Sequence, residues 1–239
     1  MIELTALEHA QIIFLIVNVV TTHIISLYMI FKYKAKKVKE LLYVGSAFLS
    51  SAIFNYYPFI ISYILILFTK NPISEAVVKI SFPISFLWII LWIVAYTKLV
   101  HQDKRKIILG LAIGFVLIFQ IHYWTVFALS PESIGDLVRG YYMNWASFIG
   151  LYLLGTMIIL LISGFDFSYR AIISEDKLTR LKGKLIATAL IFTFLGVLFE
   201  SIIILHGYWF IIPRSLHILS GIFMYLGFVL PKSIRTKFT

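Results

Sequence analysis

A few polar side chains interrupt the apolar stretches of this 239-residue chain. Glu200 stands in the run ALIFTFLGVLFESIIIL, and Arg214 and His217 begin the next apolar stretch. An ionised carboxylate inside a membrane costs about 2.5–3.5 kcal/mol on insertion scales, so it needs a proton or a cationic partner. Because the connection between the two stretches is short, we expect Arg214 to be the counter-charge of Glu200. The pair is either a structural staple or part of a binding site, and the sequence leaves both interpretations open.

Other polar residues lie at a similar depth. Counted at about 1.5 Å per residue from the nearest basic boundary, Glu200, His122 and Asn55 fall in the outer third of a hydrocarbon layer about 30 Å thick. Asn144 opens a further apolar stretch at the same end. Small residues share the helix faces of Glu200 and His122, so we expect both side chains to point into a bundle. The sequence predicts an outward-facing ligand pocket, lined by Glu200, Arg214, His217, His122, Asn55 and Asn144.

Two other kinds of chemistry fit the same residues. His122 and His217 lie on different predicted helices at comparable depth, as two axial ligands of a haem would, which suggests a haem- or quinone-holding anchor subunit of a redox complex. Glu200 as a titrating relay suggests a proton-coupled transporter, although no matching polar path continues through the other half of the membrane. Each histidine also has the simpler interpretation of a packing residue whose hydrogen bonds are satisfied.

Several classes of chemistry are absent from the pattern. The chain has no cysteine, which excludes disulfides, thiol catalysis and cysteine-bound metals. No zinc-protease, hydrolase-elbow or phosphate-loop motif appears, so we do not expect an enzyme. The seventh stretch, 213–230, contains no lysine for a Schiff base, which argues against a retinal cofactor.

The elements that must position these residues are membrane-spanning helices. The chain is 61% hydrophobic and only 13% charged, with a mean hydropathy of +0.95, so we expect an all-α polytopic membrane protein rather than a soluble one. Connections between the apolar stretches are short and no repeat stands out, which favours a single seven-helix domain over residues 1–239. The predicted spans are 9–31, 41–68, 77–100, 107–129, 145–165, 185–206 and 213–230.

Charge alternates sharply between the connections. Of the 21 basic residues, 17 lie in the first, third and fifth connections and in the tail after the seventh span. The positive-inside rule then predicts an outside N-terminus and a cytoplasmic C-terminus in the cell membrane. The net charge of +10 is therefore explained by topology and by contact with the lipid bilayer, and nucleic acid is not an expected partner.

Two connections carry helix signals of their own. Residues 130–145 are predicted to form a short interfacial helix with Ser130 as N-cap and Pro131 at its first position, serving as an anchor or as a lid. Ser174 is the expected N-cap of a helical extension that leads into the sixth span. The basic segment 170–184 is a candidate contact for a separate protein partner.

Two basic-flanked stretches, YRAIISEDKLTRLKGKLIATALIF and YLGFVLPKSIRTKF, accompany the predicted topology. Together they resemble the seven-helix N-terminal sensor regions of some prokaryotic histidine kinases and related archaeal seven-helix membrane proteins. The resemblance implies a receptor-like module that senses a small molecule or ion. No kinase or cyclase domain follows the seventh span in this sequence, so any output is expected to pass to a separate partner.

Overall fold

The computed structural model describes residues 3–202, 209, 211–231 and 236, apart from the side chains of residues 36 and 200–202. In this part of the chain seven helical segments are long and apolar enough to cross a membrane, so the protein is a seven-helix membrane protein. Each segment overlaps its predicted span. Their bounds are Ala6–Ala35, Lys39–Thr69, Glu75–Leu99, Arg105–Leu129, Ser147–Ile172, Lys177–Phe199 and Ile211–Val229.

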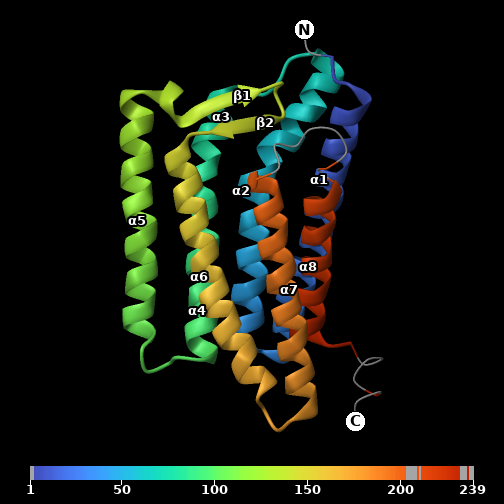
Figure 1. Ribbon diagram of the computed structural model, residues 1–239, viewed down its shortest axis with the longest axis vertical. Coiled ribbons are helices and arrows are strands. Elements are labelled where there is room, and N and C mark those ends of the chain that lie inside the picture. The colour runs from blue at the N-terminus through green and yellow to red at the C-terminus, as the bar shows by residue number, and fades with distance from the viewer. Residues whose placement is uncertain (1–2, 203–208, 210, 232–235, 237–239) are drawn as a thin grey trace.

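The helices follow one another up and down the bundle, with the third span broken into two helices (Figure 1). They are α1 (Ala6–Lys36), α2 (Lys39–Thr69), α3 (Glu75–Ser81), α4 (Leu87–Leu99), α5 (Arg105–Leu129), α6 (Ser147–Ile172), α7 (Lys177–Ile202) and α8 (Ile211–Val229). Two 3-10 helices, η1 (Phe82–Phe86) and η2 (Pro131–Ile134), and two strands, β1 (Gly135–Val138) and β2 (Tyr142–Trp145), complete the described elements.

Six of the long helices form a closed ring. Contacts run from α4 to α2, α1, α8, α7 and α6 and back to α4, and α5 packs on the outside against α4. Figure 1 shows α5 at one side of the bundle and α1 and α8 at the other. We call the end where α1 begins the hairpin end, and the end where α2 begins the basic end.

The third span changes helix type at Pro83. This residue has no N–H and cannot continue an α-helical hydrogen-bond ladder, so the chain passes through η1 between α3 and α4. The missing N–H leaves the Lys79 carbonyl, four residues earlier, without its helical donor, and this carbonyl accepts the Tyr123 hydroxyl of α5 at 2.7 Å. Gln120 of α5 also donates its side-chain N–H to the Pro83 carbonyl at 2.7 Å. Pro58, in contrast, lies inside α2 without ending it.

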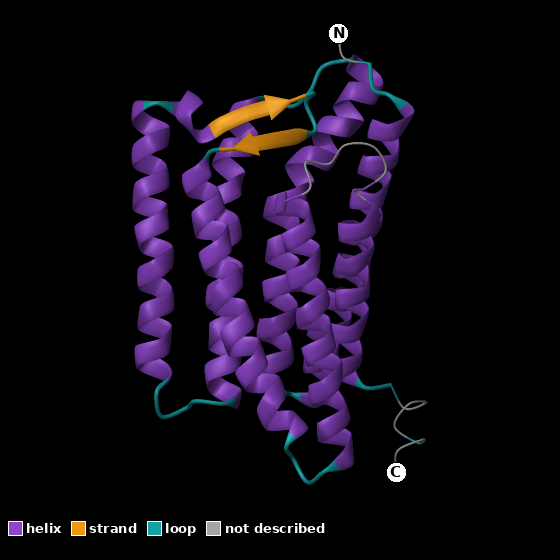
Figure 2. Ribbon diagram, in the orientation of Figure 1, coloured by secondary structure: helices purple, strands orange, loops and turns teal. Residues whose placement is uncertain are grey.

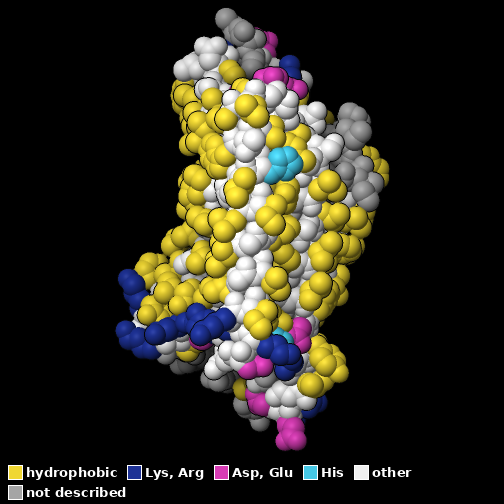
Figure 3. Space-filling model, turned by 90° about the vertical axis from the view of Figure 1, so that its left-hand side faces the viewer, with side chains coloured by type: hydrophobic (Ala, Val, Ile, Leu, Met, Phe, Trp, Pro, Cys, Tyr) yellow, Lys and Arg dark blue, Asp and Glu magenta, His cyan; other side chains and the backbone are white. Residues whose placement is uncertain are grey.

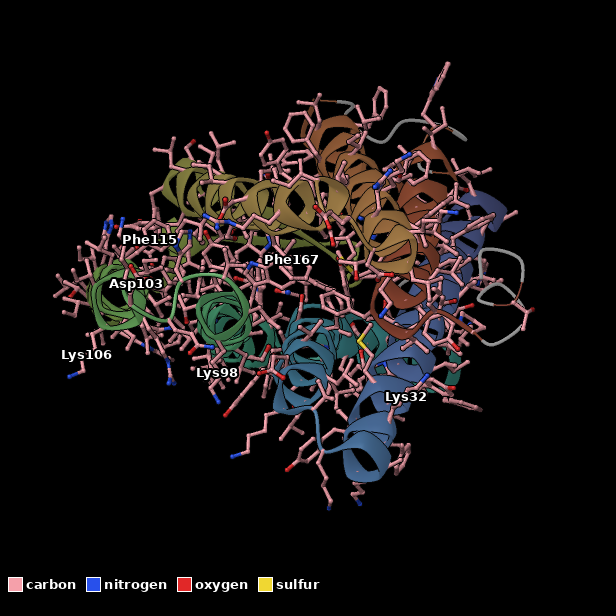
Figure 4. The ribbon with its side chains drawn as sticks, turned by 90° about the horizontal axis from the view of Figure 1, so that it is seen from below. Lys32, Lys98, Asp103, Lys106, Phe115 and Phe167 are labelled. Atoms are coloured by element: carbon pink, nitrogen blue, oxygen red, sulfur yellow. The ribbon has the colours of Figure 1, made fainter. Side chains whose placement is uncertain are left out.

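Apolar side chains cover the outside of the bundle, as a lipid environment requires. One stripe of exposed side chains follows the outer face of α6 with helical spacing: Leu151, Leu154, Ile158, Ile162, Phe165 and Tyr169. Figure 3 views the side on which α5 stands, where hydrophobic side chains dominate the middle and Lys and Arg gather toward the lower, basic end. Seen along the bundle from that end, Lys98 and Lys106 lie at its rim (Figure 4).

The predicted interfacial helix at 130–145 is wrong for most of its length. Pro131 does begin the short helix η2, but Gly135 ends it with a φ of 136°, a conformation that L side chains rarely adopt. The chain then forms the antiparallel hairpin β1–β2, the only strands among the described residues, which lies across one end of the bundle (Figure 2). The turn between the strands is the three-residue loop 139–141, in which Arg139 and Gly140 have positive φ.

The N-cap prediction at Ser174 is also wrong, by two residues. Helix α7 begins at Lys177, and the Asp176 carboxylate accepts hydrogen bonds from the Thr179 N–H at 2.9 Å and the Thr179 hydroxyl at 2.6 Å. Asp176 is therefore the capping side chain, which suits the positive end of the helix dipole. The connection between α6 and α7 reaches further than the other connections at the basic end (Figure 1).

Candidate functional site

Arg214 and His217 lie where α8 meets two other helices. The Arg214 guanidinium lies 5.8 Å from the ring centroid of Tyr56 of α2. His217 packs on Gly196 of α7, where a Cβ would come within 2.9 Å of the imidazole Cε1. The missing side chain at Gly196 is therefore what allows the imidazole to approach α7. Arg214 thus reaches α2, and His217 reaches α7.

Glu200 follows Gly196 by four residues, about one helical turn, in the same helix. Its side chain lies outside the described residues, as does His206, so its predicted pairing with Arg214 stays a prediction. Asn55 precedes Tyr56 in α2 and donates to the Ser51 hydroxyl at 3.4 Å. The helices carrying Glu200, Arg214, His217 and Asn55 are thus brought together, and we call these four residues with Tyr56 the outer polar layer.

His122 and Asn144 lie elsewhere. His122 is exposed on α5, with its ring 4.8 Å from that of Phe148 and 6.1 Å from that of Tyr152, both in α6. The expectation that it points into the bundle is therefore wrong, because α5 stands outside the ring of six helices and turns other residues toward α4. Asn144 is exposed in β2 and is paired with Asp136 of β1, so it belongs to the hairpin.

The two histidines proposed as haem ligands do not lie together. His217 is on α8 and His122 is on α5, at opposite sides of the bundle (Figure 1). Axial ligands must approach one iron from its two faces, which this separation does not allow. The described part of the chain contains no group of three or more His, Asp or Glu side chains that would hold a metal ion.

The tip of the hairpin is fastened to the start of α1. Arg139 donates to both oxygens of Glu8, from Nε to Oε1 at 2.8 Å and from Nη2 to Oε2 at 2.9 Å, and from Nη2 to the Glu3 carbonyl at 2.7 Å. Tyr141 donates to Glu8 Oε1 at 3.3 Å. Burial raises the pKa of the Tyr141 hydroxyl to about 12, and the Glu8 carboxylate beside it adds to the shift. The hydrogen bond to Glu8 also raises the pKa of Arg139.

The base of the hairpin is fastened to the third span. Lys79, only 4% exposed, donates to Glu75 Oε1 at 2.5 Å and to the Pro131 carbonyl at 2.8 Å. The other Glu75 oxygen accepts the Leu137 N–H of β1 at 3.1 Å. At the tip, Ser62 of α2 donates to the Gly140 carbonyl. The hairpin therefore ties α1, α2 and the third span together.

A second polar cluster lies at the basic end, away from every predicted site residue. Asp166 of α6 accepts from the Tyr96 hydroxyl of α4 at 2.7 Å and from Arg170 Nε at 3.0 Å, and its Oδ2 lies 3.0 Å from Nε2 of His101. Arg170 Nη2 is 3.5 Å from the same His101 nitrogen. We call Tyr96, His101, Asp166 and Arg170 the inner polar cluster.

The sequence contains a pattern that indicates this cluster, although none of its residues was predicted to form a site. Asp166 is an acid within an apolar run and precedes Arg170 by four residues, the spacing of an ion pair along one helix face. Arg170 was interpreted only as a loop charge. His101 comes from the connection between α4 and α5, so the cluster joins α4 and the α4–α5 connection to α6 close to the projecting α6–α7 connection.

Comparison with protein-family models, with curated proteins and with solved structures finds no match to this chain. The class of protein therefore rests on its own seven apolar helices and on the two polar regions described above. These features define a seven-helix membrane protein with a hairpin across one end and the inner polar cluster at the other.

Proposed function

We propose that the chain is a receptor-like or accessory module of a cell membrane, with its N-terminus and hairpin outside and its C-terminus in the cytoplasm. The concentration of Lys and Arg at the basic end supports this orientation under the positive-inside rule. In this orientation the outer polar layer opens toward the outside, and a small molecule or ion is its ligand.

One observation carries the proposal: a single helix, α8, presents Arg214 to the ring of Tyr56 in α2 and His217 to Gly196 in α7. A ligand that contacts these side chains contacts three helices at once. If it binds one arrangement of α2, α7 and α8 more tightly than another, it shifts the population toward that arrangement. No such coupling follows from His122, which lies exposed on the far side.

The ligand-induced change in helix arrangement would pass along α7 and α6. Helix α7 runs from the outer polar layer to the projecting connection at the basic end, and it packs on both α6 and α8. Lys177 and Arg180, in the first turn of α7 beside that connection, are exposed. A separate cytoplasmic protein would read the position of this connection.

The test is ligand-induced thermal stabilisation of purified protein in lipid nanodiscs. The probes are small carboxylates, amino acids, inorganic phosphate, Na⁺ and K⁺, each at rising concentration. A ligand at 100 times its Kd stabilises the folded state by about 2.7 kcal/mol, which a melting curve detects. Arg214→Gln and Glu200→Gln should each remove the shift produced by an active probe.

Arg139→Gln is the matched control, because Arg139 is a charged residue at the same end but pairs with Glu8 to fasten the hairpin. It should retain the shift. The proposal fails if no probe stabilises the wild-type protein, or if the active probe stabilises both site variants as strongly as the wild type.

A further inference from the structure

The inner polar cluster has no part in the function proposed for the outer polar layer. Its centre is one nitrogen, Nε2 of His101, which faces two groups of opposite charge on α6. Asp166 Oδ2 lies 3.0 Å away and Arg170 Nη2 lies 3.5 Å away. The His101 and Asp166 side chains are 23% and 31% exposed, so protons from the adjoining water reach them.

The protonation state and the tautomer of His101 together decide which neighbour this nitrogen can bind. A protonated imidazole carries a hydrogen on Nε2, which donates to the Asp166 carboxylate as a charge-assisted bond. A neutral imidazole with its hydrogen on Nε2 still donates to Asp166, without the added positive charge, whereas one with its hydrogen on Nδ1 leaves a lone pair on Nε2. That lone pair is repelled by Asp166 and can accept a hydrogen bond from Arg170, which has donors only.

We propose that the inner polar cluster is a proton-sensing site, in which protonation of His101 fixes its Nε2 bond on Asp166, whereas the neutral ring can also accept from Arg170. Histidine is the side chain that ordinarily changes charge between about pH 5 and 8. The bound proton would tighten the link between the α4–α5 connection and α6. Loss of the proton would loosen it, because the bond to Asp166 loses its charge assistance and the tautomer that accepts from Arg170 becomes available.

The other groups around His101 are compatible with this exchange. Tyr96 of α4 lies edge-on to the imidazole at 5.7 Å and gives its hydroxyl hydrogen to Asp166. On the histidine's own connection the charged neighbours are Asp103 and Lys104. Lys98 of α4 donates instead to the Tyr43 hydroxyl of α2 at 3.1 Å. Among the described contacts of His101, only Asp166 and Arg170 therefore compete for Nε2.

The position of the cluster gives the exchange a mechanical consequence. Asp166 and Arg170 lie in the last two turns of α6, just before the projecting α6–α7 connection. His101 is on the α4–α5 connection, so its bond to Asp166 ties that connection to the end of α6, next to the projecting connection. This inference concerns the basic end alone and stands whether or not the outer polar layer binds a ligand.

The absence of native cysteine allows a direct distance measurement. Spin labels at Gln102→Cys and Glu175→Cys, both exposed positions, report the separation of the two connections in full-length protein in nanodiscs. The separation should be short and narrowly distributed at pH 5. A second, longer population should appear as the pH rises to 8.

The pH response should be absent from His101→Gln and Asp166→Asn and present in His23→Gln, whose imidazole bonds Tyr57 instead. A response that persists in His101→Gln, or no response in the wild type, overturns the proposal. A second measurement covers variants that fail to fold. In wild-type protein with ¹⁵N-labelled histidine, the His101 Nε2 signal should change from that of a donor at pH 5 toward that of an acceptor at pH 8, and an unchanged signal would overturn the inference.

Discussion

Arg139 holds both carboxylate oxygens of Glu8, although 131 positions separate the two residues in the chain. The fork of the guanidinium matches the carboxylate, which is the geometry of the stronger ion pairs. Glu8 also closes the capping box of α1 by accepting the Thr5 N–H at 2.7 Å. One carboxylate therefore starts the first helix and fastens the hairpin that follows the fourth span.

Removal of this clamp should free the hairpin tip. In Arg139→Ala the loop at 139–141 loses its bonds to Glu8 and to the Glu3 carbonyl, so we expect faster hydrogen exchange of the amides in 135–145. Hydrogen–deuterium exchange in nanodiscs measures this. Lys70→Ala, an exposed cation at the same end, should leave the exchange rates unchanged. Equal protection in wild type and Arg139→Ala would show that strand pairing alone holds the hairpin.

The buried Lys79 should matter more for stability than any surface cation. Lys79→Ala removes the donor from Glu75 Oε1 and from the Pro131 carbonyl. We expect the free energy of unfolding to fall by about 2 kcal/mol, less than a fully buried pair would cost because Glu75 is 40% exposed. Reversible unfolding in mixed micelles measures the change. The double variant Lys79→Met with Glu75→Gln should recover part of the loss, since no unpaired carboxylate remains.

Two glycines make a matched pair for testing the outer polar layer. A Cβ at Gly196 would lie 2.9–3.1 Å from three atoms of the His217 ring, so Gly196→Ala should displace the imidazole and cost about 1–3 kcal/mol. A Cβ added at Gly114 of α5 would have no neighbouring atom within 4 Å, so Gly114→Ala should be neutral or slightly stabilising. Equal melting temperatures for the two variants would mean that His217 does not pack on α7.

The start of α7 should depend on pH through Asp176. Its hydrogen bonds from Thr179 hold the pKa of this carboxyl below its usual value. A lowered folded pKa means that the cap contributes fully above the unfolded value and is lost as the pH falls through the folded value. We expect faster amide exchange in residues 177–180 below about pH 4, the range of an ordinary aspartate. Asp176→Asn keeps a capping oxygen but should remove this acid dependence.

The number and nature of the spans could be read from the sequence because the reason for them is local. A run of about 20 apolar residues must satisfy its backbone internally in lipid, and only a helix does so within one segment. The break at Pro83 is equally local, since proline lacks an N–H wherever it stands. The spans were predicted, and the structure contains both features.

The site depended on which helices become neighbours, and no local pattern specifies that. Depth alone grouped His122 with His217, but α5 lies outside the ring and leaves His122 exposed on the far side. The sequence by itself determined seven apolar helices and the alternation of basic connections. Only the tertiary structure brought Arg214 to Tyr56, Arg139 to Glu8 and His101 to Asp166, because each pair joins segments that helix packing alone places side by side.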